Sequence, residues 1–151
     1  MDPESVCAIL NELLAAEQRA IAPRLFESTV FVSRPSVAEY PVVLRIAKQA
    51  RRNCEWLTQK VVEHRGVPAP RSPVANMANW HFQELHHVLP MVVADQEALV
   101  RTYKAAAQRL ASEPNAVESV DRILDIHLRE LDALRQLLDI ATGRAAPAST
   151  G

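Results

Sequence analysis

The chain has 151 residues, the length of one domain, which argues against a two-domain enzyme. Its 17 Lys and Arg residues balance 18 Asp and Glu residues, and the formal net charge of −1 gives no overall field that would attract nucleic acid or an anionic membrane. Hydrophobic residues make up 48% of the chain, enough for a core without disulfides, while three glycines are too few for the turns of a sheet protein. The composition predicts a helical domain that binds neither nucleic acid nor membrane.

The first residues and the cysteines bear on location. The opening MDPESVCAIL places no basic segment before an apolar run, and no stretch reaches the roughly 18 uninterrupted apolar residues of a membrane span. Cys7 and Cys54 form no Cys-x-x-Cys motif. We therefore expect a cytoplasmic protein with two free thiols.

The first predicted helix begins near Pro3, which suits the first turn of a helix, and Pro23 should kink or end it. Residues on its expected buried face recur at steps of three and four, and one acid interrupts the apolar stripe: Val6, Leu10, Leu13, Glu17, Ala20 and Arg24. The β-branched residues of STVFVSRPS then predict a long connection over residues 28–40.

The second predicted helix runs from Tyr40 or Pro41 to His64, because proline suits the first helical position and Gly66 suits a stop. Its expected buried stripe is Val43, Ala47, Ala50, Cys54, Leu57 and Val61. The prolines of GVPAPRSPVANMAN predict a long surface connection over residues 66–79.

The third predicted helix covers residues 80–110 and is bent or broken at Pro90. Its stripe holds one polar residue near the middle: Leu85, Leu89, Val92, Gln96, Leu99, Tyr103, Ala106 and Leu110. Ser112 or Asn115 can cap the last helix, with Glu118 completing a capping box after Asn115. The last stripe also has one polar residue in its middle: Val117, Val120, Leu124, His127, Leu131, Leu134, Leu138 and Ala141.

Four such helices predict an all-α four-helix bundle over residues 1–142, followed by a flexible tail over residues 143–151. Apolar residues outside the stripes predict a homodimer in which they would be covered: Trp56, Val62, Val93, Val100, Leu128 and Leu137. Glycine-rich phosphate loops, nucleophile elbows and zinc-type cysteine sets are missing from the sequence, so the common catalytic motifs assign no reaction.

The polar interruptions of the stripes predict one polar layer inside the bundle. Glu17, Gln96 and His127 each stand near the middle of their predicted helices, and Asn53 and Cys54 lie near the midpoint of the second helix. Helices of similar length bring their midpoints to similar heights. Because a buried polar group without a partner costs about 1–3 kcal/mol, these residues should be hydrogen bonded, hydrated or bound to metal.

Several segments resemble the ferritin-like superfamily, the bacterioferritin and rubrerythrin type of bundle. They are LNELLAAEQRAIAPRLFES, RRNCEWLTQKVVEHRGVP, ADQEALVRTYKAAAQRL and ILDIHLRELDALRQLL, which together span most of residues 6–140. The resemblance implies that Glu17 stands at a metal-ligand glutamate. It also implies a di-iron site made of one Glu on each of two helices and a Glu-x-x-His pair on each of the other two.

The chain departs from that ligand set. Ala50 and Asn53 stand where the second helix should supply Glu-x-x-His, Gln96 replaces a glutamate, and the last pair is reversed, as His127-x-x-Glu130. An intact di-iron oxidase is therefore not expected.

Two readings of the polar layer remain. One is a structural layer that fixes the helix register, in which His127 pairs with Glu17 or Gln96 and Glu17 can instead pair with Arg24 or Arg51. The other is a single iron, manganese or zinc ion held by Glu17, His127 and Glu130, because the i, i+3 spacing of the last two puts them on one face.

A weaker alternative metal site lies at the start of the third predicted helix. Glu84 and His87 have Glu-x-x-His spacing, with His81 one turn earlier, although clustered histidines near a helix start are commonly solvated. The favoured function is thus a binding or structural module on a ferritin-like scaffold, with room for a small molecule in its interior. The alternative is a single-metal protein or metalloenzyme.

Overall fold

The computed structural model describes residues 1–20, 39–69 and 85–143. Those residues form four helices and no strand: α1 (Pro3–Arg19), α3 (Glu39–Glu63), α4 (Leu85–Arg109) and α5 (Pro114–Ala141). The predicted all-α bundle is confirmed at this level. None of the described helices is long and apolar enough to cross a membrane.

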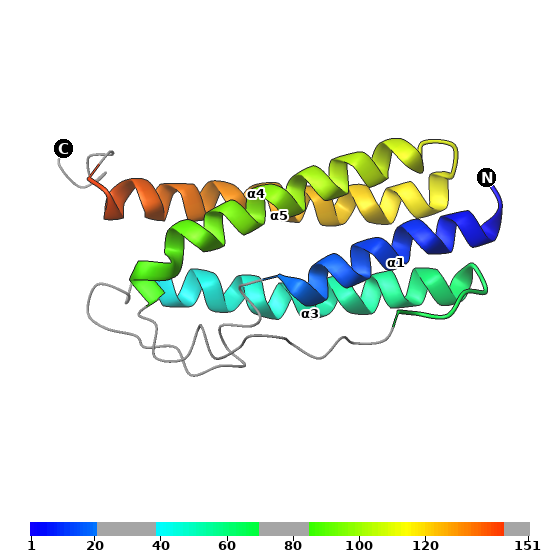
Figure 1. The fold of residues 1–151 in the computed structure, drawn as a ribbon, viewed down its shortest axis with the longest axis horizontal. Coiled ribbons are helices and arrows are strands. Elements are labelled where there is room, and N and C mark those ends of the chain that lie inside the picture. Colours follow the sequence, from blue (N-terminus) through cyan, green and yellow to red (C-terminus); the bar gives the residue numbers. More distant parts are fainter. Residues whose placement is uncertain (21–38, 70–84, 144–151) are drawn as a thin grey trace.

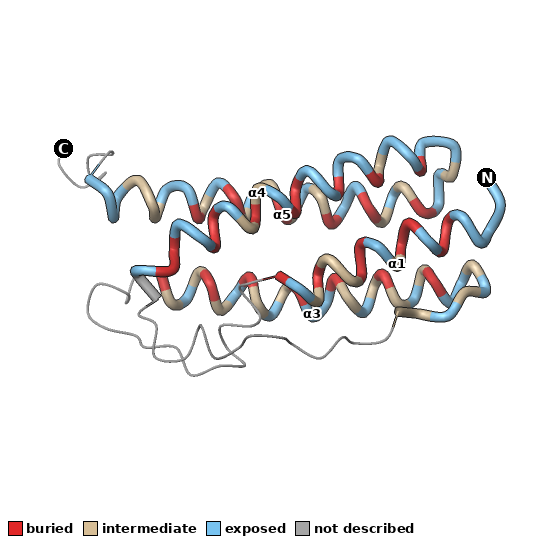
Figure 2. Tube along the Cα trace, viewed as in Figure 1, coloured by how far each residue is buried: buried red, intermediate tan, exposed pale blue. Residues whose placement is uncertain are grey.

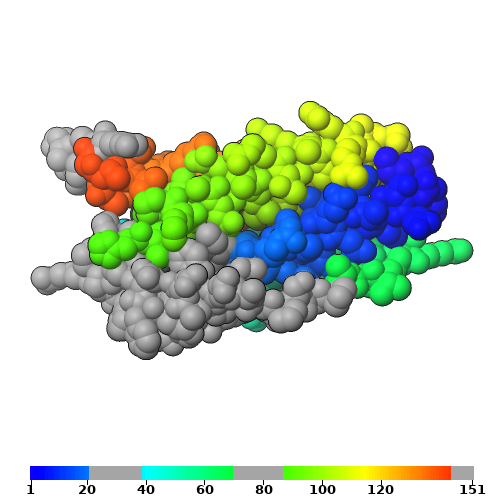
Figure 3. Space-filling view, viewed as in Figure 1, coloured from blue at the N-terminus to red at the C-terminus, as the bar shows by residue number. Residues whose placement is uncertain are grey.

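The four helices lie roughly along one axis (Figure 1). α1 runs antiparallel to α3, α4 runs parallel to α3, and α5 returns antiparallel to α4. α3 ends and α4 begins at opposite ends of the bundle, whereas α4 and α5 are joined by a short turn. α1 lies beside α4 on the face shown in Figure 3, and at 17 residues it is shorter than the other three helices.

The helix starts follow from prolines and one carboxylate. Pro3 occupies the start of α1, as predicted, and Asp2 caps the helix by accepting a 2.8 Å hydrogen bond from the Ser5 backbone N–H. α5 starts at Pro114, and its N-cap residue Glu113 makes no side-chain capping bond. The predicted capping box was therefore wrong.

The two residues predicted to cap α5 do not stand at its N-cap position. Ser112 lies before the cap, and Asn115 is already inside the helix, because Pro114 needs no N–H partner and so suits the first helical position. The side chain of Asn115 accepts a 2.9 Å hydrogen bond from Lys60 on α3 instead.

Other boundaries shifted slightly. α3 begins at Glu39, so residues 39 and 40 of the predicted first connection belong to the helix. α4 continues through Pro90 without ending, and residues 80–84 of that predicted helix lie outside the described residues. Pro23, most of both predicted connections and residues 144–151 of the predicted tail lie outside them as well.

The core is formed by the helix faces that point inward (Figure 2). The stripe of α1 from Val6 to Ala20 is buried, and so is the stripe of α4 from Leu89 to Leu110. Arg24 and the side chain of Leu85 lie outside the described residues. These two predicted stripes are confirmed where they can be followed.

The other two stripes were predicted one residue too late at several places. On α3, Ala47 and Cys54 are half-buried, whereas Ile46 and Asn53 are buried. On α5, Ala116 and Ile123 are buried in place of the predicted Val117 and Leu124. On both helices the steps of three and four residues follow one another in a different order from the predicted one.

Burial at the end of the α5 stripe and on the expected dimer surface also differs from the prediction. Leu138 is half-buried and Ala141 is exposed at the end of α5. Val93 and Val100, predicted to lie outside the core, are 4% and 5% exposed and belong to it. Of the six residues on which a dimer was predicted, Val62 alone is largely exposed, and the remaining three are half-buried: Trp56, Leu128 and Leu137.

The end of α3 has the two hydrogen bonds of a Schellman motif, from Gly66 N–H to the Val61 carbonyl and from Arg65 N–H to the Val62 carbonyl. The left-handed residue is Arg65, with φ of 61°, and not the glycine. Gly66 is needed for a different reason, because a Cβ there would lie 2.5 Å from the sulfur of Cys7 on α1. The close contact between α1 and the end of α3 depends on this glycine.

Replacing Arg65 by glycine should stabilise the protein, because glycine adopts a positive φ without the steric cost that a side chain carries there. We expect the free energy of unfolding to rise by about 1 kcal/mol, measured by urea denaturation. The matched control is Arg52→Gly, an exposed site inside α3, where the same substitution should lower stability by about 1 kcal/mol. Equal effects at the two positions would contradict the proposed strain at Arg65.

Candidate functional site

The predicted polar layer exists at the centre of the bundle. Glu17, Asn53, Gln96 and His127 come from the four different helices, and each is at most 4% exposed. Asn53, Gln96 and His127 lie near the middle of their helices. Glu17 lies in the last turn of α1, which differs from its predicted mid-helix place because α1 ends at Arg19.

The Glu17 carboxylate is the hub of this layer. Its Oε1 atom accepts hydrogen bonds from Tyr103 Oη at 2.6 Å and Asn53 Nδ2 at 3.2 Å, and pairs with His127 Nε2 at 2.5 Å. These three donors stand on α4, α3 and α5, so one oxygen of α1 is bonded to every other described helix. Its second oxygen, Oε2, is buried without a hydrogen-bond donor in the described part of the chain.

Further side chains hold the donors in place. Gln49 donates from Nε2 to Asn53 Oδ1 at 3.0 Å, one turn earlier on α3. Gln96 donates from Nε2 to the backbone carbonyl of His127 at 3.2 Å. The ring of Tyr103 lies 5.0 Å from the ring of His127, measured between centroids. Two side chains of α4, Gln96 and Tyr103, therefore hold His127 in place.

His127 stands between two carboxylates. Nε2 faces Glu17, and Nδ1 lies 3.2 Å from Glu130 Oε1, one turn later on α5. Burial alone would lower the pKa of His127, but hydrogen bonds and charge from Glu130 and Glu17 outweigh it and raise the pKa from 6.5 to about 9. At neutral pH the ring is therefore an imidazolium, and its Nδ1 side forms an ion pair with Glu130. In the neutral ring, Nδ1 can instead accept from Gln96 Nε2, which lies 3.0 Å away.

The two other ionisable groups of the layer respond to burial. Burial raises the pKa of Glu130 above its ordinary 4.5, although the hydrogen bond and charge of His127 oppose the shift. Burial, together with the nearby Glu17 charge, raises the pKa of Tyr103 well above 10, so its hydroxyl stays a donor. Apart from the ion pair with His127, neither oxygen of Glu130 has a donor among the described residues.

The residues proposed for a single metal ion do not converge in this arrangement. Glu17 and Glu130 face opposite nitrogens of the imidazole, whereas a histidine binds one ion through one nitrogen. The described residues contain no group of three His, Cys, Asp or Glu side chains arranged to hold a metal ion. The residues present therefore do not fit a di-iron centre, and the single-ion site stays a prediction that would require rearrangement.

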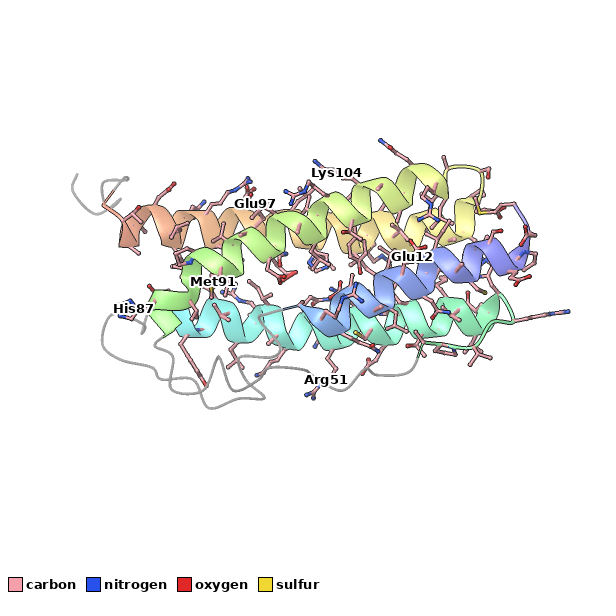
Figure 4. All side chains as sticks on the ribbon, in the orientation of Figure 1. Glu12, Arg51, His87, Met91, Glu97 and Lys104 are labelled. Carbon is pink, nitrogen blue, oxygen red and sulfur yellow. The ribbon has the colours of Figure 1, made fainter. Side chains whose placement is uncertain are left out.

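The weaker alternative site cannot be assembled from the described residues. Glu84 and His81 lie outside them, and His87 is exposed near the start of α4 at one end of the bundle (Figure 4). The pair Glu84 and His87 thus stays a prediction.

A groove opens between α3 and α5 beside the polar layer, and it has a volume of about 480 Å³. Its walls come from one stripe of each helix: Val42, Arg45, Ile46 and Gln49 of α3, and Ile126, Arg129, Glu130 and Ala133 of α5. Gln49 and Glu130 belong both to the groove and to the hydrogen-bonded centre. Sequence reasoning did not identify this groove.

The sequence-based prediction of the polar layer did not include Tyr103. Tyr103 was placed correctly in the buried stripe of α4, but its hydroxyl was not assigned to the polar layer. Its position seven residues after Gln96, two turns along the same face, was the available signal.

Comparison with known proteins gives no match: no protein-family model, no curated protein and no solved structure resembles the chain closely enough to be counted.

The stability of the protein should depend on pH through His127. Because folding raises its pKa from 6.5 to about 9, the charged ring stabilises the fold fully below pH 6.5, and this contribution is lost as the pH rises through 9. The loss amounts to about 3 kcal/mol of unfolding free energy.

Urea denaturation of wild type and His127→Gln between pH 6 and 10 measures this contribution. Glutamine can still donate to Glu17 but does not titrate, so the difference between the two proteins should shrink with rising pH. A difference that stays constant over this range would show that His127 is neutral in the folded protein.

Proposed function

We propose that the protein is a helical-bundle binding or structural module on a ferritin-like scaffold, in which hydrogen bonds between side chains take the place of a di-iron centre. The observation that carries the proposal is the bonding of Glu17. The resemblance puts this residue at a metal-ligand glutamate, and its Oε1 atom is held by three protein donors on three helices. Donors at that oxygen occupy positions from which a cation would otherwise approach.

The helix arrangement supports the same proposal. α3 and α4 are consecutive, parallel and start at the same end of the bundle (Figure 1). Ferritin-like bundles have one long crossover of this kind, whereas simple up-and-down bundles have short connections only. The cytoplasmic location belongs to this proposal and agrees with two cysteines that form no disulfide in the described part of the chain.

The second candidate is a protein that binds one iron, manganese or zinc ion through Glu17, His127 and Glu130. It is favoured by one observation: Glu17 Oε2 and both oxygens of Glu130 are buried without hydrogen-bond donors in the described residues. Buried carboxylate oxygens of this kind are suitable metal ligands. The imidazole would have to turn so that one nitrogen and both carboxylates faced the same ion.

A homodimer is also proposed, from apolar side chains near the end of α3. Val62 is 57% exposed near the end of α3, and a second copy could cover it together with the half-buried Trp56. The burial of Val93 and Val100 removes two of the residues on which the dimer was first predicted.

Metal dependence separates the two candidates. Thermal unfolding of the untagged wild type should be unchanged by a chelator and by added iron, manganese or zinc, and elemental analysis should find no stoichiometric metal ion. His127→Leu should lower the free energy of unfolding by about 1–3 kcal/mol in every condition, because Glu17 loses a buried donor.

The control is the double variant Glu84→Ala, His87→Ala, which removes the weaker alternative site and leaves the bundle centre intact. A stoichiometric metal ion that is lost in His127→Leu but kept in this control would overturn the proposal. An ion lost only in the control would assign metal binding to the start of α4 instead.

A further inference from the structure

The groove between α3 and α5 is built by matching stripes of two helices. Each helix contributes four residues at spacings i, i+3, i+4 and i+7, which is one face over two turns. Four of the eight side chains are aliphatic: Val42, Ile46, Ile126 and Ala133. The groove therefore offers an apolar surface long enough for a hydrocarbon chain or a small ring system.

Two positively charged side chains also line the groove. Arg45 and Arg129 are both exposed, and neither guanidinium forms an ion pair with a carboxylate in the described part of the chain. Arg129 Nε reaches only the backbone carbonyl of Asp125, at a long 3.4 Å. Two guanidinium groups beside an apolar wall are complementary to an anion with an apolar body.

A third charged residue of the groove restricts how many negative charges a bound anion can carry. Glu130 lines the same wall. It pairs with the imidazolium of His127, which is shared with Glu17, and it also feels the positive charge of Arg129. A ligand with two negative charges would be repelled by this carboxylate more strongly than a ligand with one. A carboxylate head group suits the site better than a phosphate dianion.

We propose that the α3–α5 groove binds a small amphipathic monocarboxylic acid, whose apolar body packs on Ile46 and Ile126 and whose carboxylate is held by Arg45 and Arg129. This proposal deepens the binding role inferred above and rests on it. Gln49 connects the groove to Asn53, and Glu130 connects it to His127, so a bound acid would contact the side chains that support the bundle centre.

Methyl NMR of the full chain tests the proposal with decanoate as the probe, below the concentration at which it forms micelles. Decanoate should shift the methyl signals of Ile46 and Ile126 in a saturable manner, while those of Ile9, buried on α1, stay in place. Decyltrimethylammonium has the same tail and a cationic head, and it should cause no saturable shift.

Variants test the contribution of each charge. Arg45→Ala and Arg129→Ala should each weaken decanoate binding about tenfold, the usual value of a charge-assisted hydrogen bond. Arg51→Ala is the matched control, because this arginine of α3 points away from the bundle and does not line the groove (Figure 4). It should bind decanoate like the wild type.

Two outcomes would overturn the inference. The first is the absence of saturable shifts at Ile46 and Ile126, and the second is equal binding of both amphiphiles with no effect of the arginine variants. Metal content and melting temperature, measured on the same samples, report on the polar centre independently. Failure of the ligand-binding proposal for the groove can thus be distinguished from failure of the proposal for the bundle centre.

Discussion

A carboxylate buried in the centre of a helical bundle constrains every helix around it. Glu17 is 1% exposed, and removing such a charge from water costs several kcal/mol unless donors replace the lost hydration. The replacement comes from Asn53, Tyr103 and His127, one on each of the other helices. A shift of α3, α4 or α5 by one residue along its axis would turn its donor away from Oε1. The polar centre therefore specifies a helix register, which interchangeable Leu and Val side chains cannot specify alone.

The same centre is connected to the protein surface on one side. Glu130 pairs with His127 Nδ1, Gln49 bonds to Asn53, and both side chains line the α3–α5 groove. Ligand contacts at the groove and proton binding at His127 therefore act on neighbouring atoms of one hydrogen-bonded system. Gln49 and Glu130 thus belong both to the buried polar centre and to the lining of the groove.

Sequence periodicity was sufficient for the helices and for one polar residue on each of α1, α4 and α5, because an apolar stripe makes a polar exception conspicuous. It was insufficient for Tyr103, whose ring belongs to the apolar pattern while its hydroxyl belongs to the polar layer. Asn115 was misassigned because a side chain that can cap a helix can equally accept from a distant lysine. The opposite placement of Glu17 and Glu130 around the imidazole depends on three-dimensional angles that residue spacing does not contain.

The bonds of Glu17, in the last turn of α1, affect how this helix can detach from the bundle. α1 is the first helix in the chain, yet its Glu17 balances a charge on α5 that lies 110 residues away. If α1 detached by itself, the imidazolium of His127 would lose one of its two counter-ions, and Tyr103 would lose its acceptor inside the remaining helices. Local fraying of α1 is therefore penalised at its inner end, and its last turn should exchange amide hydrogens together with the centres of α4 and α5 rather than as a loose terminus.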